Sequence, residues 1–125
     1  TVDVLSDIDK NAILAVPRIR LQTKEGISTK GKVVRRLALE KECMKIADAI
    51  GIRGPCCIQM KEGIDGNLKL VEINPRMGGG TIFSALAGAN LPAMIVAMAE
   101  GKRITVPRIS EVTVLRYFEE ITIAN

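Results

Sequence analysis

Three oxygen-bearing side chains and an arginine are spaced so that they could hold a metal ion beside a phosphate. Glu72, Asn74 and Arg76 alternate along one extended run, and alternating side chains of a strand point to the same face. Gln59 lies in the preceding extended run and faces them if the two runs form a simple hairpin. Carboxylate and amide oxygens suit Mg²⁺, which needs only one or two protein carboxylates. Gln59, Glu72 and Asn74 therefore form a candidate metal site.

Arg76 and the glycines after it suit an anion. A guanidinium presents a fixed fork of donors that matches a phosphoryl or acyl phosphate oxygen. Gly78-Gly79-Gly80 removes side chains where backbone amides could approach such a group. The same residues are also compatible with a strand end, a solvated turn and a plain connector, and spacing alone gives both interpretations similar weight. Triple glycine is a weak phosphate-loop signal, and the Lys of a P-loop is absent.

The composition excludes several kinds of chemistry. The chain has 125 residues and no His, which excludes His general bases, Ser-His triads and zinc sites of the usual type. The net charge of +4 arises where basic residues crowd between Lys24 and Arg36, which favours an anionic ligand. Aromatic residues make up only 2% of the chain and lie far from that stretch, so we do not expect nucleic acid as a partner.

Neither a membrane span nor a disulfide framework is expected. No apolar run approaches the roughly 20 residues of a transmembrane helix, and no signal peptide opens the chain. The three cysteines, Cys43, Cys56 and Cys57, are an odd number and are interpreted as small buried apolar residues. We therefore predict a cytoplasmic protein without a membrane partner.

Alternation and β-branched residues predict strands, and 3.6-residue periodicity predicts helices. Asp65-Gly66-Asn67 between two strands predicts an antiparallel hairpin, and the glycine-rich and lysine-rich residues 23–32 predict a mobile loop. The predicted strands cover residues 2–6, 11–22, 55–62, 67–74 and 111–120, and the predicted helices cover 34–50, 81–89 and 92–100. This order predicts an α+β fold, an antiparallel sheet with helices packed on it.

A family resemblance rests on these same residues. The run Glu72-Ile73-Asn74-Pro75-Arg76, after a Gln-bearing strand and an Asp-Gly turn, resembles the metal-binding signature of ATP-grasp enzymes. The run from Met77 to Pro92 is similar to members related to the large chain of carbamoyl phosphate synthetase, and the likeness extends over nearly the whole chain. Related ATP-grasp carboxylate-amine ligases share it.

The resemblance implies ligands and roles. Gln59 and Glu72 would bind one Mg²⁺, and Glu72 and Asn74 a second, with Mn²⁺ as an alternative ion. Arg76 would be the catalytic contact to the reacting phosphoryl group.

The resemblance also implies nucleotide contacts. An acidic residue of the first strand contacts nucleotide in the family, which matches Asp3, and a loop after the second strand matches Gly26, Ile27 and Ser28. Ser28 stands where the synthetase has a His.

For the whole protein, the resemblance implies an ATP-dependent ligase with ATP and a small carboxylate as partners. A carboxylate would attack the γ-phosphate, and an amine or similar nucleophile would displace phosphate from the acyl phosphate. Residues 1–125 match the C-terminal, Mg-ATP-binding subdomain, and the chain starts within a strand pattern without an initiator Met. We therefore expect a fragment of a longer protein that lacks the N-terminal ATP-grasp half and is inactive alone. The alternative is a non-catalytic ATP-grasp-like module used for homodimerisation or for binding another partner.

Overall fold

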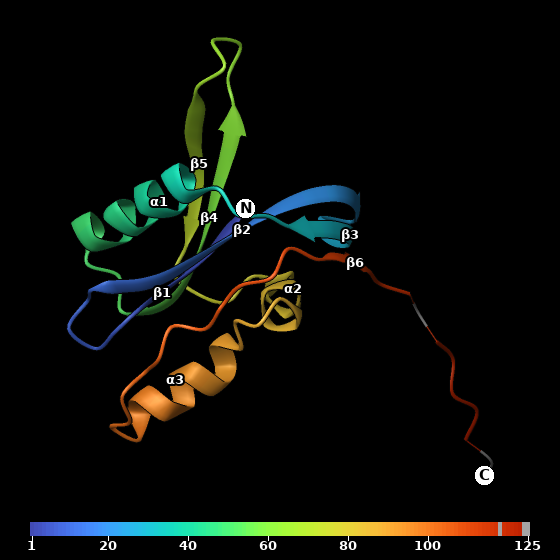
Figure 1. The fold of residues 1–125 in the computed structure, drawn as a ribbon. Helices are drawn as coiled ribbons and strands as arrows, with labels where there is room; N and C mark the ends of the chain where they lie inside the picture. The colour runs from blue at the N-terminus through green and yellow to red at the C-terminus, as the bar shows by residue number, and fades with distance from the viewer. Residues whose placement is uncertain (118, 124–125) are drawn as a thin grey trace.

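The architecture is an antiparallel sheet with helices on both faces (Figure 1). This computed structural model describes residues 1–117 and 119–123. The elements in chain order are β1 (Val2–Ser6), β2 (Ala12–Lys24), β3 (Ile27–Val33), α1 (Leu37–Ile50), β4 (Gly54–Glu62), β5 (Leu68–Asn74), α2 (Thr81–Leu86), α3 (Leu91–Ala99) and β6 (Thr113–Leu115). The six strands lie in the order β5-β4-β1-β2-β3-β6, and every neighbouring pair is antiparallel. The predicted α+β fold class is confirmed.

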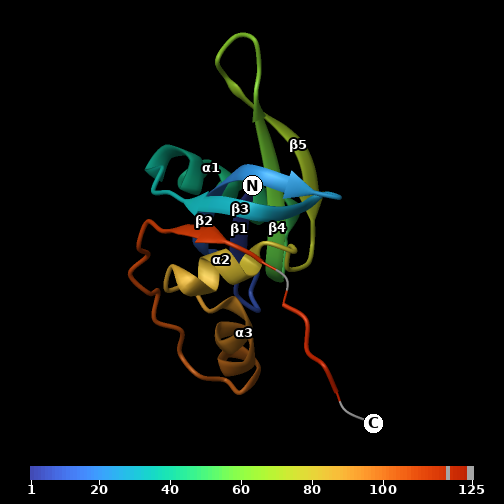
Figure 2. The same cartoon turned by 90° about the vertical axis from the view of Figure 1, so that its right-hand side faces the viewer.

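Alternation along the central strand β1 divides the core between the two faces. Val2 and Val4 pack with the α1 residues Cys43 and Ala47 on one face. Leu5 packs on the other face with Phe83 of α2, and Leu91 of α3 joins the same cluster. Figure 2 shows α1 on one side of the strands and α2 and α3 on the other. Along one strand, side chains that share the α2 face are therefore two residues apart.

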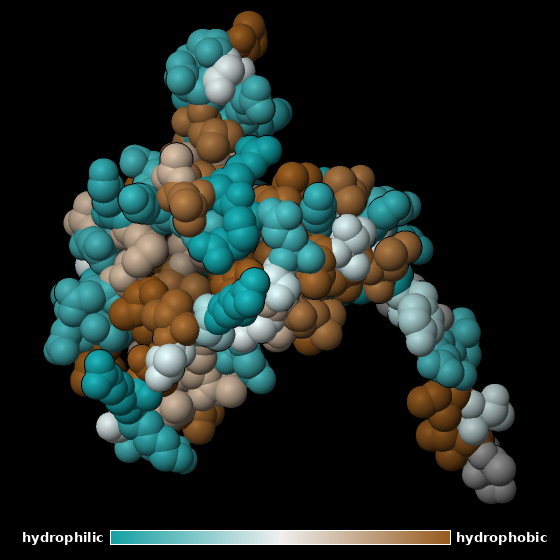
Figure 3. Space-filling model, viewed as in Figure 1, coloured by the Kyte–Doolittle hydropathy of each residue, from teal (hydrophilic) through white to brown (hydrophobic). Residues whose placement is uncertain are grey.

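The β4–β5 hairpin has the predicted turn. Asp65 Oδ1 accepts a hydrogen bond of 3.1 Å from Asn67 N, and Gly66 has a φ of 74°, which favours glycine. The outer part of the hairpin extends beyond the rest of the molecule (Figure 1). Apolar surface appears at its tip in Figure 3, where the turn residue Ile64 is fully exposed.

The prediction of a mobile loop over residues 23–32 is wrong. β2 continues to Lys24, a two-residue turn follows, and β3 pairs with β2 from Ile27 onward. Glu25 and Gly26 have φ values of 51° and 79°, and two positive φ values are the mark of a type I′ hairpin turn. The strand forms despite its lysines because Val33 is fully buried in the core and Ser28 is nearly so.

Several predicted boundaries also differ. The helix predicted from residue 34 begins at Leu37, because Val34 N instead donates to Pro17 O and extends the contact between β3 and β2. The helix predicted over 81–89 ends at Leu86, and the next runs from Leu91 to Ala99. The strand predicted over 111–120 is only Thr113–Leu115, and residue 118 of that range lies outside the described residues.

The described helices and cysteines bear on two further predictions. Every helix among the described residues is too short or too polar to cross a bilayer. Cys43, Cys56 and Cys57 are free thiols, and all three are buried, as predicted. Adjacent Cys56 and Cys57 lie on opposite faces of β4, since Cys56 packs with the α1 cluster and Cys57 lines a cavity on the α2 face.

Candidate functional site

The hairpin register places the predicted metal ligands together. Gln59 of β4 lies directly opposite Glu72 of β5, and Cys57 lies opposite Asn74. All four side chains therefore share the α2 face of the sheet. Asn74 Nδ2 donates to Glu72 Oε1 at 2.5 Å, which brings the carboxylate and the amide together.

A cavity of about 270 Å³ opens on this face beside the ligand set. Its walls come from the start of β1, the outer part of β2, the β2–β3 turn, β4, the end of β5 and the glycine run. The lining residues are Thr1, Arg18, Arg20, Glu25, Gly26, Ile27, Ser28, Cys57, Gln59, Asn74, Arg76, Gly78, Gly79 and Gly80.

The cavity gathers most of the residues that the sequence analysis singled out. Gly26, Ile27 and Ser28 line it from the β2–β3 turn, and Gln59, Asn74 and Arg76 line it from the opposite ribbon. Glu72 lies beside it through its hydrogen bond to Asn74. Residues more than 30 positions apart in sequence thus meet at one place, as a shared ligand site requires.

Asp3 lies behind the cavity, not in its wall. Only 1% of its surface is exposed, and its carboxylate accepts hydrogen bonds from Arg18 at 2.8 and 2.6 Å. Ser84 Oγ donates to the same carboxylate at 2.6 Å. A contact between Asp3 and a nucleotide stays a prediction. In this structure Asp3 contacts Arg18, and Arg18 lines the cavity.

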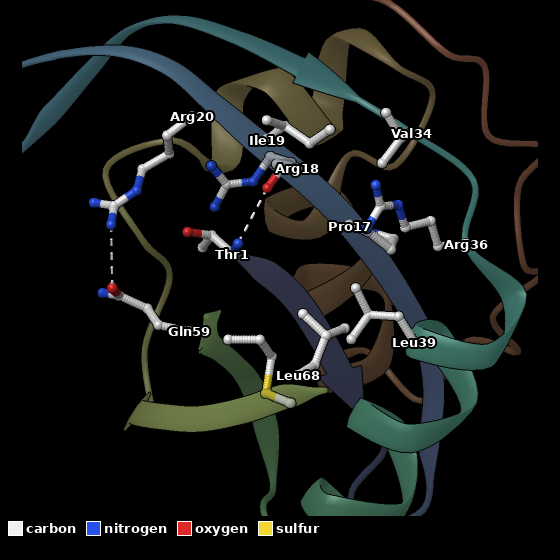
Figure 4. A pocket seen from close by; sticks show the side chains of 11 residues that line it. Thr1, Pro17, Arg18, Ile19, Arg20, Val34, Arg36, Leu39, Gln59 and Leu68 are labelled. Atoms are coloured by element: carbon white, nitrogen blue, oxygen red, sulfur yellow. Dashed lines mark hydrogen bonds between the residues drawn. The ribbon is translucent and has the colours of Figure 1, made fainter. Parts of the chain in front are cut away.

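Two arginines of β2 were not recognised as site residues from the sequence. Arg18 and Arg20 are two positions apart, so both side chains lie on the α2 face. Figure 4 shows Arg20 reaching from β2 toward Gln59, and its Nη2 lies 3.4 Å from Gln59 Oε1. Their alternation with apolar residues in Val16-Pro17-Arg18-Ile19-Arg20 was the available signal.

Charge in the cavity wall is predominantly positive. Arg18, Arg20 and Arg76 supply three guanidinium groups, and Glu25 supplies one carboxylate. The pKa of the Cys57 thiol is raised chiefly because the thiol is buried and secondly because Asp3 is near, while Arg18 and Arg76 oppose this shift. A buried thiol whose pKa is raised is unsuited to act as a thiolate nucleophile.

A second cavity, of about 250 Å³, opens on the opposite face of the sheet, also between β2 and β4. It shares Thr1, Arg18, Arg20 and Gln59 with the site cavity, and its other walls are mostly apolar side chains such as Ile19 and Leu39 (Figure 4). The metal-ligand candidates Glu72 and Asn74 are not in its wall.

The candidate ligands fit magnesium by their chemistry. The set contains one carboxylate and two amide groups, and Mg²⁺ takes few protein carboxylates and completes its shell with water and phosphate. Among the described residues, no cluster of three His, Cys, Asp or Glu side chains exists that would suit a softer or more fully coordinated metal. Gln59, Glu72 and Asn74 stay the predicted ligands for Mg²⁺.

Comparison with known proteins identifies the family. Residues 1–121 match the family described as ATP-grasp in the biosynthetic pathway with Ter operon. The chain belongs to this ATP-grasp family. None of the curated proteins compared with the chain matches it.

Proposed function

We propose that this chain is the Mg²⁺-binding and nucleotide-binding half of an ATP-dependent ligase that activates a carboxylate as an acyl phosphate. The observation that carries the proposal is the cavity that joins Gln59, Asn74 and Arg76 to the turn residues 26–28. The family match supports the ATP-dependent part of this proposal.

The proposed reaction has two steps. A carboxylate oxygen bonds to the γ-phosphorus of ATP, the bond from that phosphorus to the bridging oxygen breaks, and ADP leaves. The nitrogen of an amine or similar nucleophile then bonds to the acyl carbon, its proton is lost, and inorganic phosphate leaves. Such chemistry depends on positioning and on electrostatic stabilisation, which suits a site without His.

Each residue has a role in this proposal. Arg76 donates to the oxygens of the transferring phosphoryl group, where negative charge is concentrated. Gln59, Glu72 and Asn74 hold two Mg²⁺ ions, or Mn²⁺ in their place, which neutralise the phosphate charge when bound. Backbone groups of Gly26 and Ile27, with Ser28, contact the nucleotide.

The size of the cavity supports the need for a second half. Its volume of about 270 Å³ falls below the roughly 300–1,000 Å³ of typical ligand pockets. We propose that an N-terminal ATP-grasp half supplies the remaining wall and that the small carboxylate substrate binds between the halves. The likeness of residues 77–92 to the large chain of carbamoyl phosphate synthetase supports carbamoyl phosphate synthesis as one option, and ligation of amino acids is an equal alternative. We propose that the protein acts in the cytoplasm.

The test is Mg²⁺-dependent ATP turnover by the full-length protein. Glu72→Ala removes the only carboxylate of the ligand set, so turnover is expected to be abolished while the fold is retained. Glu62→Gln is the matched control, because Glu62 is an exposed carboxylate of the same hairpin outside the cavity wall. A normal turnover rate in Glu72→Ala contradicts the proposal. Calorimetry of Mg-ATP binding to this chain and to a chain extended upstream tests whether binding requires the N-terminal ATP-grasp half.

Exposed apolar side chains favour a second candidate function, a non-catalytic homodimerisation module. Leu115, Tyr117, Ile121 and Ile123 are between 67% and 85% exposed along the last part of the chain. Exposed apolar surface of this kind marks protein interfaces. The dimer is expected to appear as concentration-dependent association in sedimentation equilibrium, together with an absence of Mg-ATP binding by the extended chain.

A further inference from the structure

The buried ion pair between Asp3 and Arg18 leaves part of the arginine unused. Arg18 Nε donates to Asp3 Oδ2 and Nη2 donates to Asp3 Oδ1, so one edge of the guanidinium is occupied. Within the described part of the chain, Nη1 donates no hydrogen bond to the protein. Only 3% of the Arg18 side chain is exposed, so bulk water solvates little of this group.

The unused edge of Arg18 faces the site cavity. Arg18 lines the cavity, and Nη1 lies against Gly80, where an added Cβ would overlap it. Nη1 is not among the fully enclosed polar atoms without a partner, which in the described residues are Ser6 Oγ and Thr29 Oγ1. Nη1 therefore keeps some accessible surface, and its contact with Gly80 places it at the wall of the site cavity.

Asp3 fixes the position of that edge. Its carboxylate accepts from Ser84 Oγ at 2.6 Å and lies 3.5 Å from Thr81 Oγ1, besides its two bonds to Arg18. These four contacts join Asp3 of β1 to β2 and to α2 at once. A guanidinium bound bidentately to such an anchor cannot rotate without breaking charge-assisted hydrogen bonds. The free edge of Arg18 is therefore preorganised.

The surroundings favour an anion at this edge. Arg76 and Arg20 line the same cavity, and only Glu25 adds negative charge to its wall. A Cβ built on Gly79 would meet nothing within 4 Å, so this part of the wall is open to a ligand. A buried guanidinium with unused donors gains most from an oxyanion, because charge-assisted hydrogen bonds are strongest away from water.

We propose that Arg18 binds an oxyanion of the substrates in the site cavity through Nη1, with Asp3 as its positioning residue. The proposal rests on the proposed function, since it extends that site by one ligand contact. The oxyanion is either a phosphoryl group of the nucleotide or the carboxylate to be activated. Both present oxygens that accept from one guanidinium edge.

The experiment measures anion binding without metal, so that it does not depend on turnover. Inorganic pyrophosphate and acetate are titrated separately, without Mg²⁺, into the ¹⁵N-labelled chain, and the Arg18 Nε and Gly79 and Gly80 amide signals are followed by NMR. Saturable shifts with pyrophosphate assign the phosphoryl source, and saturable shifts with acetate assign the carboxylate source. If neither anion gives saturable shifts in the wild-type chain, the proposal is overturned.

Variants separate binding from folding. Arg18→Gln alone leaves Asp3 buried without its counter-charge, so the double variant Asp3→Asn with Arg18→Gln removes both charges and keeps hydrogen-bonding groups at both positions. We expect the double variant to fold and to bind the anion at least about tenfold more weakly, since it loses one charge-assisted hydrogen bond. Affinity equal to that of the wild type would show that Arg18 serves only the ion pair.

Arg36→Gln is the control for loss of a guanidinium group outside the site cavity. Arg36 lines the cavity on the opposite face of the sheet and not the site cavity. The anion affinity of the Arg36→Gln variant is expected to stay within about twofold of wild type, because exposed charges are screened by salt. An equal loss in Arg36→Gln and in the double variant overturns the proposal. Failure of the Glu72→Ala turnover test with Arg18-dependent anion binding intact would instead contradict only the proposed function.

Discussion

The guanidinium of Arg116 lies over the ring of Phe83, with Cζ 4.9 Å from the ring centroid. Its Nη2 donates to Gly79 O at 2.7 Å, and its backbone N donates to Thr29 O at 2.8 Å. One residue after β6 is thus joined to α2, to the glycine run and to β3. The glycine run that lines the cavity is held by Arg116 at Gly79 and packs against Arg18 at Gly80.

Arg116→Ala is expected to lower the free energy of unfolding by about 1–2 kcal/mol. The substitution removes a cation–π contact and one charge-assisted hydrogen bond, both partly exposed to solvent. Urea denaturation measures the change. Arg103→Ala is the control, since Arg103 is exposed and makes no hydrogen bond or ion pair within the described residues, and it is expected to stay within about 0.5 kcal/mol of wild type. Equal effects in both variants would show that the Arg116 contacts contribute nothing.

Gly31→Ala is expected to destabilise the fold by about 1–3 kcal/mol, the usual cost of overpacking. A Cβ at Gly31 would lie 2.6 Å from Phe83 Cε2 and 3.2 Å from Ile19 O. The Phe83 ring would have to shift, while the backbone oxygen of Ile19 is fixed by the sheet. Chemical denaturation measures the loss. Gly79→Ala is the control, because its Cβ would meet no atom within 4 Å.

A double-mutant cycle checks the cause of the Gly31→Ala effect. Phe83→Leu removes the ring edge that the new Cβ would strike, so Gly31→Ala should cost less in that background than in wild type. The same cost in both backgrounds would assign the loss to the backbone of β3 instead of Phe83.

Stability is expected to fall as the pH rises above about 9, through the buried thiols. Burial raises the pKa of Cys43 and of Cys56 from 9.0 to about 11. Below pH 9 both thiols stay protonated in the folded and unfolded chains, so they add no pH dependence there. Between these values the unfolded chain releases protons that the folded chain retains, which favours unfolding.

Urea titrations at a series of pH values measure this effect. The double variant Cys43→Ala with Cys56→Ala is less stable overall because of its cavities, but its stability should fall less steeply between pH 9 and 11. If the stability of that variant falls as steeply with pH as that of the wild type, other groups cause the loss of stability at alkaline pH.

The β4–β5 hairpin was predictable because its turn signal is local, whereas the pairing of Gln59 with Glu72 depends on a bulge that this signal does not predict. Asp65-Gly66-Asn67 specifies a turn, and the register beside that turn pairs Glu62 with Leu68. Continued along the strands, this register would set Gln59 opposite Val71, on the other face of the sheet. A bulge between Gln59 and Met60 shifts it by one residue and sets Gln59 opposite Glu72. The same reasoning failed at β3, where Lys30 and Lys32 suggested a solvated loop. That strand is stabilised by pairing with β2 and by the burial of Val33, which are tertiary effects. The two-residue turn Glu25-Gly26 was the signal that was missed.

The Asp3–Arg18 pair could not be predicted from the sequence. Asp3 pairs directly with Val16, so Arg18 is its diagonal neighbour, and the register depends on how β1 meets β2 around the turn at Asp7 to Asn11. Ser84, the third member, comes from a helix 81 residues away. Contacts of this kind follow from the packing of α2 on the sheet, and no local pattern encodes them.

The walls of the site cavity come from segments that are far apart in the chain, from Thr1 to Gly80. No short peptide of this sequence contains the cavity, so a ligand that fills it binds the folded chain and not the unfolded one. By mass action such a ligand adds about 2.7 kcal/mol to the free energy of unfolding at a hundredfold excess over its Kd. A compound that occupies this cavity is therefore expected to raise the melting temperature of the chain.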